Sequence, residues 1–194
     1  PCGLMDQMAC AVGGFVYIDF EDTKNPVIEK IPFDLSGAGY ALCIVNTGGN
    51  HADLNEDYAS VPSDMKKTAQ FLDVDYLRQT SRDKLLEKAK DIRESLGDRC
   101  FMRALHLFDE NERVKVQTEA LKNGNIALFL SKVRESGLSS FTMLQNVYTT
   151  KNVDEQGLSL ALALSSTVLS VDDFAAYRVH GGGFAGTIQS FVPK

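Results

Sequence analysis

Short apolar segments separated by turns dominate the first quarter of the chain. Residues 4–12 are apolar apart from two positions, one of them Asp6, and a glycine pair follows, so the sequence predicts a short helix that ends there. Residues 15–18 and 27–31 are rich in β-branched and aromatic side chains and predict two strands around a polar turn, the second at a sheet edge. The unbroken apolar run of residues 40–46 predicts a strand buried on both faces.

Apolar residues at helical spacing take over in the middle of the chain. Ser81 is expected to cap one of these helices and Asp154 another, because a short polar side chain at the N-cap accepts a hydrogen bond from a free backbone N–H. The predicted helices span residues 57–72, 83–95, 99–122, 126–136 and 154–169.

The end of the chain returns to a strand pattern. Residues 174–180 and 187–192 are typical of strands, and a glycine-rich loop at residues 181–186 separates them. Together the predicted elements indicate an α+β fold in which helices cover an antiparallel sheet.

Composition narrows the class of protein. With 194 residues, of which 44% are hydrophobic and 24% charged, the chain is typical of a folded globular protein. Its net charge of −6 offers no basic surface for nucleic acid, and no apolar run approaches the roughly 20 residues that cross a membrane. The cysteines lack metal-binding spacing, so we expect reduced thiols in a cytoplasmic protein at Cys2, Cys10, Cys43 and Cys100.

Asp6 is the strongest single candidate for a catalytic residue. It is expected in the first turn of an apolar helix, where backbone amides and the helix dipole favour a negative charge. Such a carboxylate is a weak base but a good group for positioning a hydroxyl. The alternative is a structural aspartate that satisfies the helix N-terminus, and composition alone favours that alternative.

The glycine loop is a second candidate. Three consecutive glycines can take positive φ or let the backbone approach another group, and exposed amides in such a loop can hold a phosphate. A sharp connection between two strands explains the same residues without any ligand.

The histidines are weaker candidates for catalysis or metal binding than Asp6 and the glycine loop. His51 and Asp53 follow the apolar run, but two ligands do not make a metal site, and a solvated loop is the simpler interpretation. His106 falls in a charged helical segment, where a network of surface salt bridges is a more common role than catalysis. The spacing supports no Ser-His-Asp or Cys-His arrangement.

The order of these motifs resembles the galactokinases, a branch of the GHMP small-molecule kinase family. The resemblance extends over essentially the whole chain and is carried by CGLMDQ at residues 2–7, RALHLFDENERV at 103–114 and GGGFAG at 181–186. It implies only the C-terminal portion of such an enzyme. Residues 36–194 would form the GHMP kinase C-terminal α+β domain, a ferredoxin-like antiparallel sheet with helices, and residues 1–35 a remnant of the N-terminal, ribosomal S5 domain 2-like domain.

The resemblance also implies a reaction, in which ATP with Mg²⁺ phosphorylates the C1 hydroxyl of α-D-galactose. Asp6 matches the catalytic aspartate that contacts this hydroxyl, Gly3 matches a backbone contact to the sugar, and Tyr58 matches a tyrosine that borders it. The family's third motif, which supports the nucleotide-binding region, is matched by Gly181, Gly182, Gly183 and Gly186.

Other family features are not found in this sequence. The GEHxDY sugar motif and the GLSSSA-type phosphate loop are missing, and with them the main ligands of ATP and Mg²⁺. His180, Ala185 and the arginine-free stretch after Tyr58 also depart from the usual pattern. Because the chain starts at Pro1 without a methionine, we expect a segment of a longer kinase. We expect this segment to be inactive by itself because the phosphate loop is missing. A sugar sensor that binds galactose and ATP without useful turnover is the alternative, and association with a second copy through surface exposed by truncation is a further hypothesis.

Overall fold

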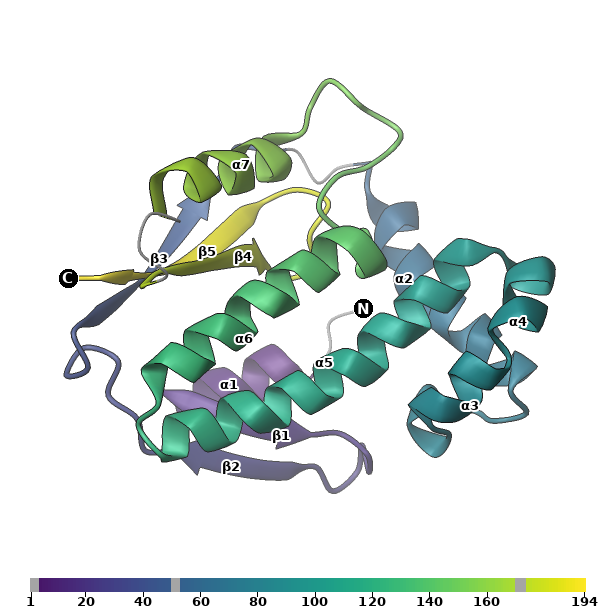
Figure 1. Cartoon of the computed structure of the whole chain (residues 1–194), viewed down its shortest axis with the longest axis horizontal. Coiled ribbons are helices and arrows are strands. Elements are labelled where there is room, and N and C mark those ends of the chain that lie inside the picture. The colour runs from purple at the N-terminus through teal and green to yellow at the C-terminus, as the bar shows by residue number, and fades with distance from the viewer. Residues whose placement is uncertain (1–3, 50–52, 170–173) are drawn as a thin grey trace.

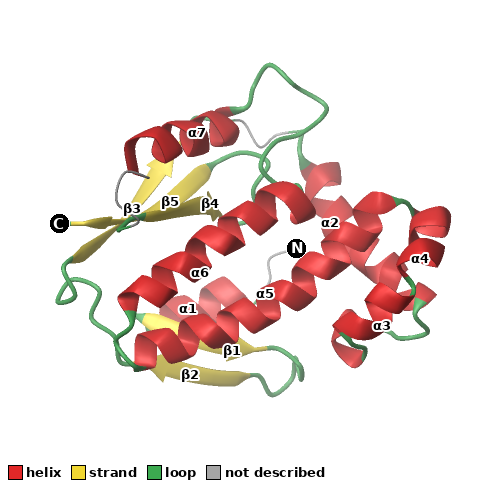
Figure 2. Ribbon diagram, viewed as in Figure 1, coloured by secondary structure: helices red, strands yellow, loops and turns green. Residues whose placement is uncertain are grey.

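The fold combines two antiparallel sheets with a layer of long helices (Figure 1, Figure 2). A computed structural model describes residues 4–49, 53–169 and 174–194. The helices in these ranges are α1 (Met5–Val12), α2 (Asn55–Phe71), α3 (Arg82–Glu87), α4 (Ala89–Leu96), α5 (Asp98–Lys122), α6 (Ile126–Ser139) and α7 (Gly157–Leu169). The strands are β1 (Phe15–Asp19), β2 (Val27–Ile31), β3 (Tyr40–Asn46), β4 (Ala176–His180) and β5 (Thr187–Pro193), and shorter turns are the 3₁₀ helix Leu77–Gln79 and the π-helical segment Ser140–Leu144.

Each sheet has a simple topology. β1 and β2 form a hairpin in which Phe15 lies opposite Ile31. The larger sheet has the order β3-β5-β4, so β5 is its central strand, and Val45 and Val179 both lie opposite Ile188. α6 packs against β4, and α7 packs against β4 and β5. This α+β arrangement of helices and antiparallel strands confirms the predicted fold class.

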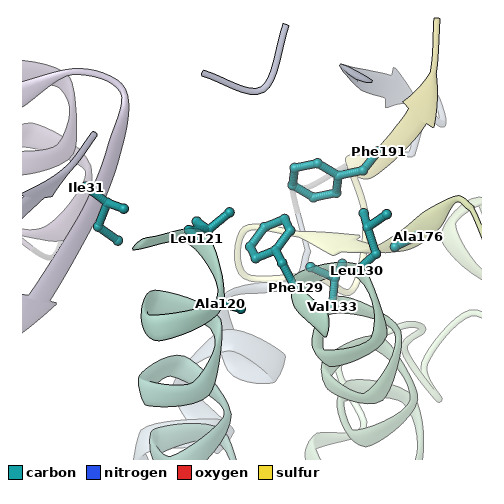
Figure 3. Packing of buried hydrophobic residues seen from close by; sticks show 8 residues of the cluster. All are labelled: Ile31, Ala120, Leu121, Phe129, Leu130, Val133, Ala176 and Phe191. Carbon is teal, nitrogen blue, oxygen red and sulfur yellow. The ribbon is translucent and has the colours of Figure 1, made fainter. Parts of the chain in front are cut away.

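One hydrophobic cluster joins the two sheets through α5 and α6 (Figure 3). Phe129 of α6 contacts Phe15 of the hairpin and Phe191 of β5 edge-on, with ring centroids 5.9 and 5.2 Å apart. Such aromatic pairs bury large apolar areas and prefer this geometry. The buried members of the cluster are Ile31, Ala120, Leu121, Phe129, Leu130, Val133, Ala176 and Phe191.

A second cluster holds the helical part of the molecule together. Leu85, Ile92 and Ala104, from α3, α4 and α5, are fully buried in it. Beside it, a buried ion pair links α2 to α5, since Arg103 Nη1 lies 2.8 Å from Asp64 Oδ2 and both side chains are almost inaccessible to solvent. The helices therefore pack through apolar contacts and one buried charge pair.

The structure corrects the predicted boundaries of two helices. The segment expected as one helix over residues 83–95 divides at Lys88 into α3 and α4, and this change of direction buries both Leu85 and Ile92. Ser81 caps α3 as expected, because its side chain accepts a hydrogen bond from the N–H of Lys84. The last helix begins at Gly157, so Asp154 precedes it and is not its cap.

The expectation that residues 40–46 are buried on both faces is wrong. β3 is an edge strand that pairs only with β5, and Leu42, Ile44 and Val45 are between 44 and 49% exposed. The apolar run of residues 40–46 indicates a strong tendency to form a strand. Whether that strand is buried depends on which elements cover it.

Candidate functional site

The glycine turn, residues 181–186 between β4 and β5, has a backbone that only glycine adopts easily. Gly181, Gly183 and Gly186 have positive φ angles of 70°, 81° and 100°. A Cβ atom on Gly182 would lie 2.8 Å from Cε1 of Tyr58, and one on Gly183 would lie 1.9 Å from the backbone oxygen of Asn146. Close packing therefore requires glycine at positions 182 and 183, and backbone conformation favours it at 181, 183 and 186.

Tyr58 fixes this turn from α2. Its hydroxyl donates a hydrogen bond to the backbone oxygen of Gly183 at 2.8 Å, and its ring lies edge-on to Phe184 with the centroids 5.5 Å apart. Burial, and to a smaller extent the charge of Asp57, raises the pKa of the Tyr58 hydroxyl. The hydroxyl therefore stays protonated and remains a donor at neutral pH.

Asn146 also holds the turn in place, and sequence reasoning missed it. Its side-chain amide donates to the backbone oxygen of Gly182 at 3.1 Å, and its backbone oxygen accepts a hydrogen bond from the N–H of Phe184. The preceding residue, Gln145, has a left-handed φ of 57°, which redirects the chain after the π-helical segment. A single asparagine outside any motif carries no signal that sequence reasoning can use.

An open pocket lies beside the glycine turn, with a volume of about 730 Å³. The turn contributes Phe184 and Ala185 to its lining. Thr47, just after β3, also lines it, and its hydroxyl donates to the backbone oxygen of Gly186 at 2.8 Å. Lys151 also lines it and is held by Glu56 of α2, with the two charged atoms 2.6 Å apart. The pocket thus combines a glycine-rich backbone with mixed charges.

Asp6 lies in the first turn of α1, as predicted, and is exposed to solvent. α1 packs against β1, next to the hairpin in Figure 1. Within the described ranges, no hydrogen bond or ion pair joins Asp6 to Tyr58 or to the glycine turn. The structure therefore brings Tyr58 and the glycines together and leaves Asp6 on a separate element with an accessible carboxylate.

The remaining candidate residues of the sequence add no metal site within the described ranges. Gly3 and His51 lie outside the described residues, and Asp53 is exposed just before α2. Across residues 4–49, 53–169 and 174–194, no group of three His, Cys, Asp or Glu side chains could hold a metal ion. The helices in the same ranges include none long and apolar enough to cross a membrane.

The expectation of a surface location for His106 is wrong. Only 6% of the residue is exposed, and its Nδ1 lies 2.8 Å from the hydroxyl oxygen of Ser139 on α6. Burial lowers the pKa of this imidazole, while the nearby Glu110 carboxylate opposes that effect. α6 covers this face of α5, and a single helical segment of sequence cannot show which neighbour will cover it.

The charged residues near His106 form a partly buried network next to β4. Arg178 of β4 lies 3.3 Å from Glu110 of α5 and also donates to the hydroxyl of Ser136 on α6. Glu110 forms a second ion pair with Arg113. Burial lowers the pKa of Arg178, and Glu110 opposes that shift. The network anchors the strand that leads into the glycine turn.

Comparisons with known proteins find similarity to the same enzymes that the order of the motifs resembles. No family model matches the chain. Galactokinase from Glaesserella parasuis serovar 5 is 27% identical over all of this chain and 47% of its own length, and that from Streptomyces coelicolor is 30% identical over 96% of this chain and 45% of its own length. The chain is similar to galactokinases along its whole length.

The solved structures give the same result for the fold. The crystal structure of Lactococcus lactis galactokinase complexed with galactose superposes with a TM-score of 0.74, at 19% identity, over all of this chain and 47% of that one. This likeness confirms the expected GHMP kinase fold. The galactokinase-like chain spans about half the length of the curated relatives that it matches.

Proposed function

We propose that this chain is the C-terminal portion of a galactokinase, which transfers a phosphoryl group from ATP to the C1 hydroxyl of α-D-galactose. The observation that carries the proposal is the assembly of Tyr58 with the glycine turn, through a hydrogen bond that spans 125 positions of sequence. The resemblance assigned Tyr58 to the border of the sugar and the glycines to the loop that supports the nucleotide-binding region. Similarity to galactokinases along the whole chain supports the same assignment.

Asp6 has the properties of a positioning group in this reaction. Phosphoryl transfer depends chiefly on orientation and on stabilising charge. An exposed carboxylate at the start of α1 can accept a hydrogen bond from the C1 hydroxyl and orient its oxygen for in-line attack. In this proposal Gly3 and Tyr58 border the sugar, and Gly181, Gly182, Gly183 and Gly186 support the nucleotide-binding region.

Among the described residues, no three acidic, histidine or cysteine side chains converge. In this proposal the main ligands of ATP and Mg²⁺ are those of the GEHxDY and GLSSSA-type motifs, which this sequence does not contain. The contribution of the present residues is to orient the sugar and to shape the turn beside it.

The first prediction concerns Asp6 in the whole parent protein. Asp6→Asn should lower kcat for galactose by about 100-fold or more, because the amide loses the charge that holds the hydroxyl in place, while galactose binding persists. ADP release measured over a panel of hexoses, together with calorimetric binding of galactose, checks both parts. Asp83→Asn, in the first turn of α3, is the matched control and should retain full activity.

Full activity of the Asp6→Asn parent would contradict the assigned role. A wild-type parent that binds galactose and ATP without turnover would identify a sensor and overturn the kinase proposal. The 194-residue chain alone should show no ATP- and galactose-dependent turnover in the same assay, and measurable turnover would contradict that expectation.

A further inference from the structure

Arg103 opens the segment RALHLFDENERV, to which the proposed reaction gives no role. The residue lies on α5 with only 2% of its surface exposed, and it is the bulkiest of the fully buried side chains in the described ranges. Burying a guanidinium costs free energy unless its N–H groups find acceptors. The acceptors of Arg103 therefore show what its burial achieves.

The first acceptors of Arg103 lie on α2, the helix that carries Tyr58. Arg103 Nη1 donates to the hydroxyl of Ser60 and to Oδ2 of Asp64, each at 2.8 Å. The Ser60 hydroxyl in turn donates to the backbone oxygen of Asp57 at 2.7 Å. These contacts lie on both sides of Tyr58 in sequence, so they fix the part of α2 from which Tyr58 reaches the glycine turn.

The other acceptor of Arg103 lies at the end of the π-helical segment that precedes Asn146. Arg103 Nε donates to the backbone oxygen of Leu144, the last residue of that segment, at 3.0 Å. Its first residue, Ser140, accepts a hydrogen bond from Arg178 of β4 at 3.3 Å. Since β4 already holds the start of the segment, Arg103 fixes its end and thereby the position of Asn146.

Both sets of contacts lead to the same two residues of the glycine turn. Tyr58 donates to the backbone oxygen of Gly183, and Asn146 donates to that of Gly182. The fit leaves little room for movement, because a Cβ atom on Gly183 would overlap the backbone oxygen of Asn146. A guanidinium holds its N–H groups in a rigid planar fork, so one side chain keeps both supports of the turn at a fixed separation.

We propose that Arg103 is a positioning residue for the glycine turn, because it fixes α2 and the π-helical segment relative to each other. Since it is buried, it acts through Tyr58 and Asn146. The expected effect on turnover rests on the proposed function, whereas the effect on the turn rests on the described contacts alone. All of these contacts are made between described residues, so the inference depends on no exposed surface.

The alternative is that Arg103 serves stability alone, as half of an ion pair with Asp64. A buried ion pair is weak evidence of stabilisation, because apolar side chains of similar volume often replace it without loss. The ion pair uses Nη1, whereas the bond to Leu144 comes from Nε. Removing the pair as a whole therefore separates stability from positioning.

Two variants make this separation, Arg103→Lys and the double variant Arg103→Met with Asp64→Leu. Lysine keeps a charge beside Asp64 but lacks the planar fork, and the double variant leaves neither partner of the pair buried with an unpaired charge. Arg99→Lys is the matched control, because Arg99 donates to the same Asp64 from the same helix but its side chain is 53% exposed. Circular dichroism and urea unfolding establish that each variant is folded.

Hydrogen exchange of the 194-residue chain tests the effect on the turn without any ligand. The N–H of Phe184 donates to the backbone oxygen of Asn146, so its exchange reports on that support. In the folded Arg103 variants, exchange in residues 181–187 should rise about tenfold or more, without a comparable rise in residues 126–139. Arg99→Lys should leave both segments unchanged. An equal rise in both segments, or none in the turn, would overturn the proposal.

Turnover of the whole parent protein tests the effect on the reaction, with ADP release measured well below the unfolding temperature of each variant. Both Arg103 variants should lower kcat by about tenfold or more, because small displacements of positioning groups slow phosphoryl transfer, and Arg99→Lys should retain the wild-type kcat. Wild-type kcat in the double variant would show that Arg103 serves stability alone, against the proposal. A wild-type parent without turnover would instead contradict the kinase function, and the exchange pattern would then decide the role of Arg103 in the turn.

Discussion

At the scale of single residues, the candidate site depends on contacts between residues far apart in sequence. Gly183 is the clearest case, because its oxygen accepts a hydrogen bond from Tyr58 while its Cα lies against Asn146. A glycine run by itself is compatible with many turns. The positions of Tyr58 and Asn146 select this one.

Gly183→Ala should therefore destabilise the chain far more than Gly181→Ala. Both residues have positive φ, but a Cβ atom meets nothing within 4 Å at Gly181 and overlaps the backbone oxygen of Asn146 at Gly183. We expect a loss of about 1 kcal/mol at Gly181 from the backbone conformation alone, and about 3 kcal/mol or more at Gly183. Urea unfolding monitored by circular dichroism measures both, and equal losses would contradict the packing argument.

His106 should make stability depend on pH. Burial lowers its pKa in the folded chain below the usual value of 6.5, so the unfolded chain binds more protons below that pH. This contribution to stability is present above about pH 6.5 and is lost as pH falls toward the folded pKa. Among the nearby charges, Arg113 and Arg178 add to the lowering of this pKa, and Glu110 and Asp109 oppose it.

The test is the free energy of unfolding between about pH 7.5 and pH 5. His106→Gln should flatten the decline on the acidic side, whereas His180→Gln, at an exposed position, should leave it unchanged. If the decline persists in His106→Gln, another group causes it.

At the scale of elements, buried charges decide how the helices pack. Asp64 of α2 accepts hydrogen bonds from Arg103 and Arg99 of α5, and Arg103 also donates to the backbone oxygen of Leu144. Burial lowers the pKa of the Arg103 guanidinium, and Asp64 opposes that effect. The pair fixes the position of α2, and α2 in turn carries Tyr58.

Asp64→Asn should cost about 3–5 kcal/mol of stability, because it leaves the charge of Arg103 buried without a counterion. Asp91→Asn is the control: its ion pair with Lys88 is 52% exposed on both sides, so its loss should cost no more than about 0.5 kcal/mol. Thermal and urea unfolding compare the two. A loss below 1 kcal/mol at Asp64, on the order of a surface pair, would contradict the role assigned to the buried charge.

At the scale of the whole molecule, Phe129 links the hairpin to the larger sheet. It contacts Phe15 on one side and Phe191 on the other, within the cluster that spans α5 and α6. The two sheets share no strand pairing, so this aromatic contact and its neighbours hold α1 and Asp6 against the rest of the chain.

Phe129→Ala should cost about 3–5 kcal/mol and loosen the hairpin, because it leaves a cavity between both sheets. Hydrogen exchange should rise in residues 15–31 more than in residues 187–193. Phe174→Ala removes a side chain that is 64% exposed and should leave both stability and exchange nearly unchanged. If hydrogen exchange in residues 15–31 is unchanged in Phe129→Ala, contacts other than those of Phe129 hold the hairpin, and the prediction is contradicted.

The sequence by itself determined most of the order and type of the secondary structure, apart from the division into α3 and α4. It also determined the helix that carries Asp6 and the motif order shared with galactokinases, because these depend on local propensity and residue identity. Tertiary structure alone decided that β3 is not buried on both faces, that His106 is buried beneath α6, and that Asn146 shapes the glycine turn. Each of these depends on which distant segment packs against the residue, and no local pattern records that.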